Sequence, residues 1–227
     1  MRYRTCFFVF FFLFSSSPVW AQKALTEGYI NYNIKLESPD KKVFTGTYTF
    51  TFKGTQLRKD LQLSNGYRHV IILNSATNII YSLQNRNGKK YAVELAMDDV
   101  MKKQEKYLNF TITNEEVQPN PVAGCVAYKS KINYKDGSSA DLCYTKEWYP
   151  AIPVTYNRYP DSRFMPLIFS YKDEDGIIMY FDAEKIEAAP VENANFRIPN
   201  DYTIISNAEY KQMQVRWTTT FREWCLF

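Results

Sequence analysis

Apolar and polar residues alternate with a period of two over much of the chain. Every second residue from Ile30 to Leu36 is apolar, and four aromatic side chains share one phase between positions 44 and 52: Phe44, Tyr48, Phe50 and Phe52. Successive side chains of a β-strand point to opposite faces, so this alternation is typical of a strand with one buried face. The pattern therefore predicts strands at 30–36 and 44–52.

Shorter apolar runs follow at close intervals. They predict strands at 57–63, 69–73, 79–83, 91–95, 109–113, 167–171 and 177–186, and a hairpin with strands at 126–134 and 140–148. Turn residues such as Asn65-Gly66 and Asn87-Gly88 lie between them, and such short connections join antiparallel neighbours. We expect one antiparallel sheet of roughly nine to eleven strands, in a single domain over residues 22–206.

One segment has the periodicity of a helix. Between Ala96 and Tyr107, an apolar face is formed by Met97, Val100, Met101 and Tyr107, and acidic residues near the start precede lysines near the end. This charge order stabilises a helix through its dipole. A helix between antiparallel strands covers one face of the sheet, and methionines provide adaptable packing there. The segment is expected either to complete the core or to form a movable cover over an apolar cavity.

A long loop is expected at residues 148–166. Four prolines break it into extended pieces, and it carries five aromatic residues: Trp148, Tyr149, Tyr156, Tyr159 and Phe164. Loops of more than about 12 to 15 residues are usually functional or disordered. The aromatic residues favour a loop that packs on the domain or contacts a ligand.

The first 21 residues have the pattern of a secretory signal peptide. Arg2 and Arg4 precede an apolar run from Cys6 to Phe14, and Val19-Trp20-Ala21 forms a small-residue cleavage site. The apolar run is far shorter than the roughly 20 residues of a spanning helix. No cysteine follows the cleavage point, so we expect an exported mature protein with neither a transmembrane anchor nor a lipid-attachment cysteine.

Composition narrows the class of function. The chain has 227 residues, 17% of them aromatic, and a net charge of +4; its mean hydropathy is -0.40. Once Arg2 and Arg4 are removed, 26 basic residues face 24 acidic ones. This near balance argues against a nucleic-acid partner, and the low hydropathy argues against a polytopic membrane protein.

Three cysteines remain after cleavage, Cys125, Cys143 and Cys225. The expected hairpin places Cys143 opposite about residue 131, so Cys125 would lie roughly 20 Å further along the strand. A bridge between these two is therefore not expected. Cys225 could pair with either only if the tail at residues 207–227 folds back. The aromatic residues of this tail fit neither the helical nor the strand period cleanly, which leaves open a helix, an added strand or sequence foreign to the domain.

Neither a catalytic centre nor a cofactor site is indicated. The one histidine, His69, adjoins an apolar run, and no nucleophile motif accompanies it. No cysteine and histidine spacing predicts a metal site, and the sequence has no Gly-rich phosphate loop. The acidic residues between 172 and 176 lack the spacing of a calcium loop and are expected to form a solvated hairpin turn. We expect a protein that is not an enzyme.

Three short segments carry a family resemblance: Val122-Ala123-Gly124-Cys125, Tyr144-Thr145-Lys146-Glu147, and Phe196 to Tyr202 with Ile198-Pro199 inside it. In this order, after a signal peptide and a strand series, they resemble the LolA-like exported proteins of Gram-negative bacteria. That superfamily includes the periplasmic outer-membrane lipoprotein carriers and an uncharacterised branch. The resemblance runs over roughly residues 27–205.

The resemblance implies a mainly β (α+β) fold in which a large curved antiparallel sheet forms an unclosed barrel with covering helices. It implies a periplasmic or outer-membrane-associated, non-catalytic binding protein that takes a lipid, an acyl chain or a lipoprotein into an apolar cavity. Phe44, Tyr48, Phe50 and Phe52 would form the wall, and Met97 and Met101 the cover. The family's functional arginine is not matched to a residue here, although Arg58 lies in an expected strand and Arg68 directly precedes one. The alternative is a structural or interaction module of the cell envelope without a small ligand.

Overall fold

The computed structural model describes residues 22–86, 88–160, 162–173 and 176–216. The predicted signal peptide, the thiol of Cys225 and the end of the tail lie outside these residues. The strands of the main sheet are β2 (Glu27–Glu37), β3 (Val43–Lys53), β4 (Gln56–Leu63), β5 (Arg68–Asn74), β6 (Ile79–Arg86), β7 (Lys89–Ala96), β8 (Thr111–Val117), β9 (Tyr128–Asn133), β10 (Ser139–Thr145), β12 (Met165–Lys172), β13 (Ile178–Glu187) and β14 (Thr203–Ser206).

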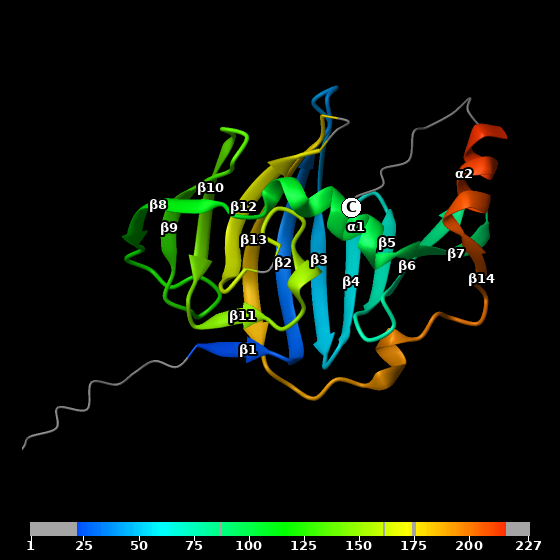
Figure 1. Cartoon of the computed structure of the whole chain (residues 1–227), viewed down its shortest axis with the longest axis horizontal. Coiled ribbons are helices and arrows are strands. Elements are labelled where there is room, and N and C mark those ends of the chain that lie inside the picture. Colours follow the sequence, from blue (N-terminus) through cyan, green and yellow to red (C-terminus); the bar gives the residue numbers. More distant parts are fainter. Residues whose placement is uncertain (1–21, 87, 161, 174–175, 217–227) are drawn as a thin grey trace, which may run out of the picture.

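These twelve strands form one curved sheet in the order β14-β7-β6-β5-β4-β3-β2-β13-β12-β10-β9-β8. The sheet is not closed into a barrel, since β14 and β8 are its two edges (Figure 1). The expected mainly β fold with an unclosed curved sheet is confirmed. All neighbouring pairs in this sheet are antiparallel except β14 with β7, which run parallel. The sheet is one strand larger than the upper expectation, and β14 is the strand that the sequence did not indicate.

The expected loop at 148–166 contains short regular pieces. Its first residues form β11 (Trp148–Pro150), which pairs in parallel with β1 (Lys23–Leu25) in a separate two-stranded sheet. The 3-10 helix η2 (Pro153–Thr155) follows. Parallel pairing ties the beginning of the loop to the start of the described chain, and in Figure 1 the segment runs in front of the main sheet.

The expected helix is present as α1 (Met97–Gln104), extended by the 3-10 helix η1 (Glu105–Tyr107). It crosses the same side of the sheet as the loop (Figure 1). The helix α2 (Asn207–Arg216) lies beside β7 and β14, at the edge of the sheet opposite to β8 (Figure 1). The first part of the tail is therefore helical.

Two apolar clusters lie on opposite faces of the sheet. The larger cluster joins the concave faces of the central strands, α1 and the loop, with Tyr32, Phe50 and Phe52 among its most buried residues. The smaller one lies on the outer face of β5–β7 under the 3-10 helix η3 (Asn193–Phe196), whose Phe196 is buried there. Residues 70–73 of β5 are consecutively buried for this reason, which explains an apolar run without alternation.

The register of the β9–β10 hairpin differs from the expectation by two residues. Cys143 pairs with Lys129 rather than with residue 131. The connection has three residues, 135–137, rather than the five left between the expected strands, since the Tyr134 amide donates to the Ser138 carbonyl at 2.9 Å. Gly137, with a φ of +82°, supplies the left-handed residue that such a loop requires. Cys125 and Cys143 are both free thiols.

Candidate functional site

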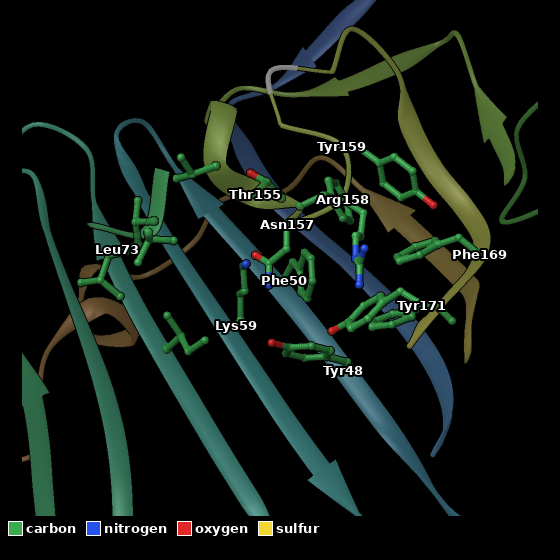
Figure 2. Close-up of a pocket in the computed structure, with 16 residues that line it drawn as sticks. Tyr48, Phe50, Lys59, Leu73, Thr155, Asn157, Arg158, Tyr159, Phe169 and Tyr171 are labelled. Atoms are coloured by element: carbon green, nitrogen blue, oxygen red, sulfur yellow. The ribbon is translucent and has the colours of Figure 1, made fainter. Parts of the chain in front are cut away.

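A pocket lies between the concave face of the sheet and the covering segments (Figure 2). The sheet provides its aromatic floor, the loop its roof, and α1 one side chain, Val100. The lining residues are Tyr48, Phe50, Lys59, Ile71, Leu73, Ile80, Val100, Val154, Thr155, Tyr156, Asn157, Arg158, Tyr159, Phe169, Tyr171 and Phe181.

The aromatic floor is closely packed. The rings of Phe169 and Phe181 stack with centroids 4.3 Å apart, and Tyr48 meets Phe50 edge to face at 4.7 Å. Such geometries stabilise aromatic pairs by about 0.5 to 1.5 kcal/mol beyond the area they bury. The floor is therefore a preformed apolar surface.

The loop fills most of the space above this floor with its own side chains. The Tyr156 hydroxyl lies 2.5 Å from that of Tyr32 and 3.1 Å from the Met165 sulfur, while the Tyr32 hydroxyl donates to the Pro166 carbonyl at 2.7 Å. Tyr159 is 1% exposed. The remaining cavity measures about 40 Å³. That is room for a few water molecules and about a tenth of a usual ligand pocket.

The residues predicted to line a cavity are only partly brought together. Tyr48 and Phe50 line the pocket, whereas Phe52 is fully buried in the core outside the pocket lining and Phe44 is half-buried against the core. Of the two methionines, Met97 is buried outside the pocket lining and Met101 is 46% exposed. Positions 97, 100 and 104 of α1 form its inward face. Position 101 lies beside this face and is exposed to solvent.

Lys59 is the site residue that sequence analysis missed. It follows Leu57 and precedes Leu61 in the inward phase of β4, and it is 8% exposed. Its ammonium lies 5.3 Å from the centroid of the Phe50 ring, and no described residue forms a hydrogen bond or ion pair with it. Burial lowers the pKa of Lys59 to about 8. The signal was a lysine at a core position of an alternating strand.

The two arginines noted in the sequence lie on the outer face. Arg58 and Arg68 both pair with Asp60, at 2.8 and 2.6 Å. Their hydrogen bonds hold the pKa of Asp60 below its usual value against the effect of burial. The carboxylate nearest to Lys59 in the chain is thus bound on the opposite face of the sheet.

Arg158 closes another side of the pocket (Figure 2). Its guanidinium lies 4.2 Å from the centroid of the Tyr107 ring and 5.6 Å from that of Tyr171. It donates a hydrogen bond of 2.7 Å to the Lys172 carbonyl. These contacts with a helix and a strand hold the roof of the pocket in place.

Two fully buried polar atoms lack a hydrogen-bond partner among the described residues: Nδ1 of His69 and Oε1 of Gln104. His69 Nε2 lies 2.8 Å from the Ser82 hydroxyl. Burial, followed by the nearby charge of Lys59, lowers the pKa of His69 to about 4. No acid orients the imidazole through Nδ1, as a catalytic triad requires, and Ser82 is only 1% exposed. This pair is a buried polar contact rather than a reactive one.

Neither a metal centre nor a membrane-spanning helix is found in the described part of the chain. No group of three or more His, Cys, Asp or Glu side chains in residues 22–216, apart from the undescribed gaps, is placed to hold a metal ion. No helix within the same described segments is long and apolar enough to cross a membrane.

Comparisons with known proteins return a likeness of structure alone. No protein-family model and no curated protein matches the chain. Among solved structures, a LolA superfamily protein from Nitrosomonas europaea is similar, with a TM-score of 0.40 and 10% identity, over 78% of this chain and 92% of that one. At this distance the function has to be inferred from the pocket.

Proposed function

We propose that the protein is an exported, non-catalytic binding protein that holds an apolar chain, from a lipid, a free acyl chain or a lipoprotein, on the concave face of its sheet. The observation that carries this proposal is the aromatic-lined pocket roofed by an irregular loop. A second sheet or a long helix would seal such a face with regular backbone structure. The proline-rich loop is instead held mainly by side-chain contacts, because the backbone hydrogen bonds of Thr155 and Tyr159 are internal to the loop, and such a segment can open locally. The signal-peptide pattern supports export.

Binding requires the loop to withdraw, since the cavity of about 40 Å³ is too small for an acyl chain. Lifting Tyr156 and Tyr159 costs about 2 to 3 kcal/mol for each exposed ring. Burial of each methylene contributes about 0.8 kcal/mol of favourable free energy, so burial of a chain of about twelve carbons contributes roughly 10 kcal/mol. The ligand therefore offsets the opening cost, and in the described conformation the loop occupies the place of the chain.

The proposal is tested by fluorescence titration with dansyl-labelled undecanoic acid and its methyl ester. Saturable binding of either probe is expected. Tyr156→Ala should bind the probes more tightly, because it removes a ring that the ligand must displace. Tyr149→Ala is the matched control: Tyr149 is a half-buried tyrosine of the same loop that lies outside the pocket lining, with its ring against Arg163.

Equal affinities for the two variants would contradict displacement of Tyr156 by the ligand. If neither probe binds saturably to the wild type or to either variant, the carrier proposal fails and the alternative, a structural or interaction module of the envelope, takes its place. Native mass spectrometry of protein purified from its own host, with solvent extraction, would identify a natural ligand directly.

A further inference from the structure

The pocket contains positive charge without compensating acid. Lys59 and Arg158 are its cationic lining residues, and none of the sixteen lining residues is an aspartate or glutamate. Arg158 is partly compensated by the Lys172 carbonyl and two tyrosine rings. The Lys59 ammonium lies against the face of the Phe50 ring and has no hydrogen-bond or ion-pair partner among the described residues.

An unpaired buried ammonium is costly. Removing a charge from water without a partner disfavours the charged form by several kcal/mol, and an apolar residue at position 59 would complete the apolar row of Leu57 and Leu61. Buried polar groups in folded proteins normally have a hydrogen-bond partner. A group without one within the chain therefore suggests a partner from outside the chain, such as a ligand. An anion entering the pocket would satisfy Lys59.

The surroundings of Lys59 suit an anionic head group. Figure 2 shows its side chain extending from β4 toward the roof segment that carries Asn157. The Asn157 side-chain oxygen accepts a hydrogen bond of 3.1 Å from Gln104, and its amide nitrogen donates to no described residue. The cavity of about 40 Å³ that Lys59 and Asn157 line admits a few atoms.

We propose that Lys59 binds the carboxylate or phosphate of an anionic amphiphile whose apolar chain lies on the aromatic floor of the pocket. This inference rests on the proposed function and adds the class of ligand. Arg158 contributes to the positive potential from the roof, and the Asn157 amide supplies a second donor. A charge-assisted hydrogen bond stabilises such a complex more than a neutral one does.

The test compares dansyl-labelled undecanoic acid with its methyl ester at pH 7, using wild type, Lys59→Met and Lys35→Met. Lys35 is the matched control because it lies on the exposed face of β2, two strands from β4, over the Tyr180 ring, and its loss changes the net charge equally. We expect the wild type to bind the acid about tenfold or more tightly than the ester, since a hydrogen bond to a charged group is worth about 1.5 to 3 kcal/mol. Lys59→Met should abolish this preference and retain ester binding, and Lys35→Met should change neither.

The outcomes separate the two proposals. Equal binding of acid and ester by the wild type overturns the anion site and leaves the carrier function standing. An equal loss of both in Lys59→Met, with a urea midpoint no lower than that of the wild type, does the same. Absence of binding by all three proteins overturns the carrier function. Displacement of the acid probe by dodecanoate or by dodecyl phosphate, and not by dodecanol, supports the site, and the stronger competitor identifies the head group. Equal displacement by dodecanol contradicts it.

Discussion

Lys59→Met should change the pH dependence of stability in a way that reports directly on the buried ammonium. The folded-state pKa of Lys59 is lowered from 10.5 to about 8 by burial. Between these values the unfolded chain binds more protons than the folded one, so the stability of the wild type rises with pH. Methionine at this position has a similar length and does not titrate. The variant is therefore expected to be the more stable protein at pH 7, with an advantage that shrinks above pH 8.

The magnitude follows from the difference of about 2.5 pKa units, which corresponds to about 3 kcal/mol at 1.36 kcal/mol per unit. The advantage of Lys59→Met should fall by roughly this amount between pH 8 and 10.5. The groups that face Lys59 do not obscure the effect. His69 is neutral above pH 7, since its pKa is lowered to about 4. Burial raises the pKa values of Tyr48, Tyr156 and Tyr171, and Arg158 and the other tyrosines are common to both proteins.

The assay is urea denaturation of both proteins at a series of pH values from 7 to 10, followed by tyrosine and tryptophan fluorescence. The quantity compared is the difference in free energy of unfolding, in which titrations shared by the two proteins cancel. A difference that stays constant over the range would refute the reasoning. It would mean that the ammonium reaches solvent or an acid, and the basis for an anion site at Lys59 would disappear with it.

Two further predictions concern positions away from the pocket. His69→Gln keeps a partner for Ser82 and removes the titration; because the pKa of His69 is lowered to about 4 when folded, the wild type should lose up to about 3 kcal/mol between pH 6.5 and 4, and the variant should not. Parallel acid-unfolding curves would contradict this. Gly28→Ala should destabilise by more than about 2 kcal/mol, since its φ is +138° and a Cβ would lie 2.1 Å from the Glu187 carbonyl oxygen. Gly66 is also at positive φ, but a Cβ there would have nothing within 4 Å, so Gly66→Ala should lower the free energy of unfolding by only about 1 kcal/mol. Similar unfolding midpoints for the two variants would show that the contact of Gly28 with β13 is not tight.

Local pattern was enough to predict most of the fold. The alternation in β2 and β3 and the helical spacing of α1 come from short-range periodicity, which a sequence displays directly. Turn residues between strands indicated antiparallel neighbours, as in the β9–β10 hairpin, although the loop there is two residues shorter than expected. The two parallel pairs escaped prediction. Thr203 of β14 pairs with Tyr91 of β7, more than a hundred positions earlier, and nothing local in a four-residue segment indicates such a partner.

The candidate site depended more strongly on tertiary structure. Alternation determined that Tyr48, Phe50 and Lys59 face the same side of the sheet, because strand geometry alone sets that. It did not show that Asp60, the acid next to Lys59 in the chain, would be held on the other face by two arginines. Composition showed that residues 148–166 would be an aromatic loop, but not that Tyr156 and Tyr159 would fill the concave face. Whether a face becomes a cavity or a core is decided by which distant segment packs on it, and that choice depends on the whole fold.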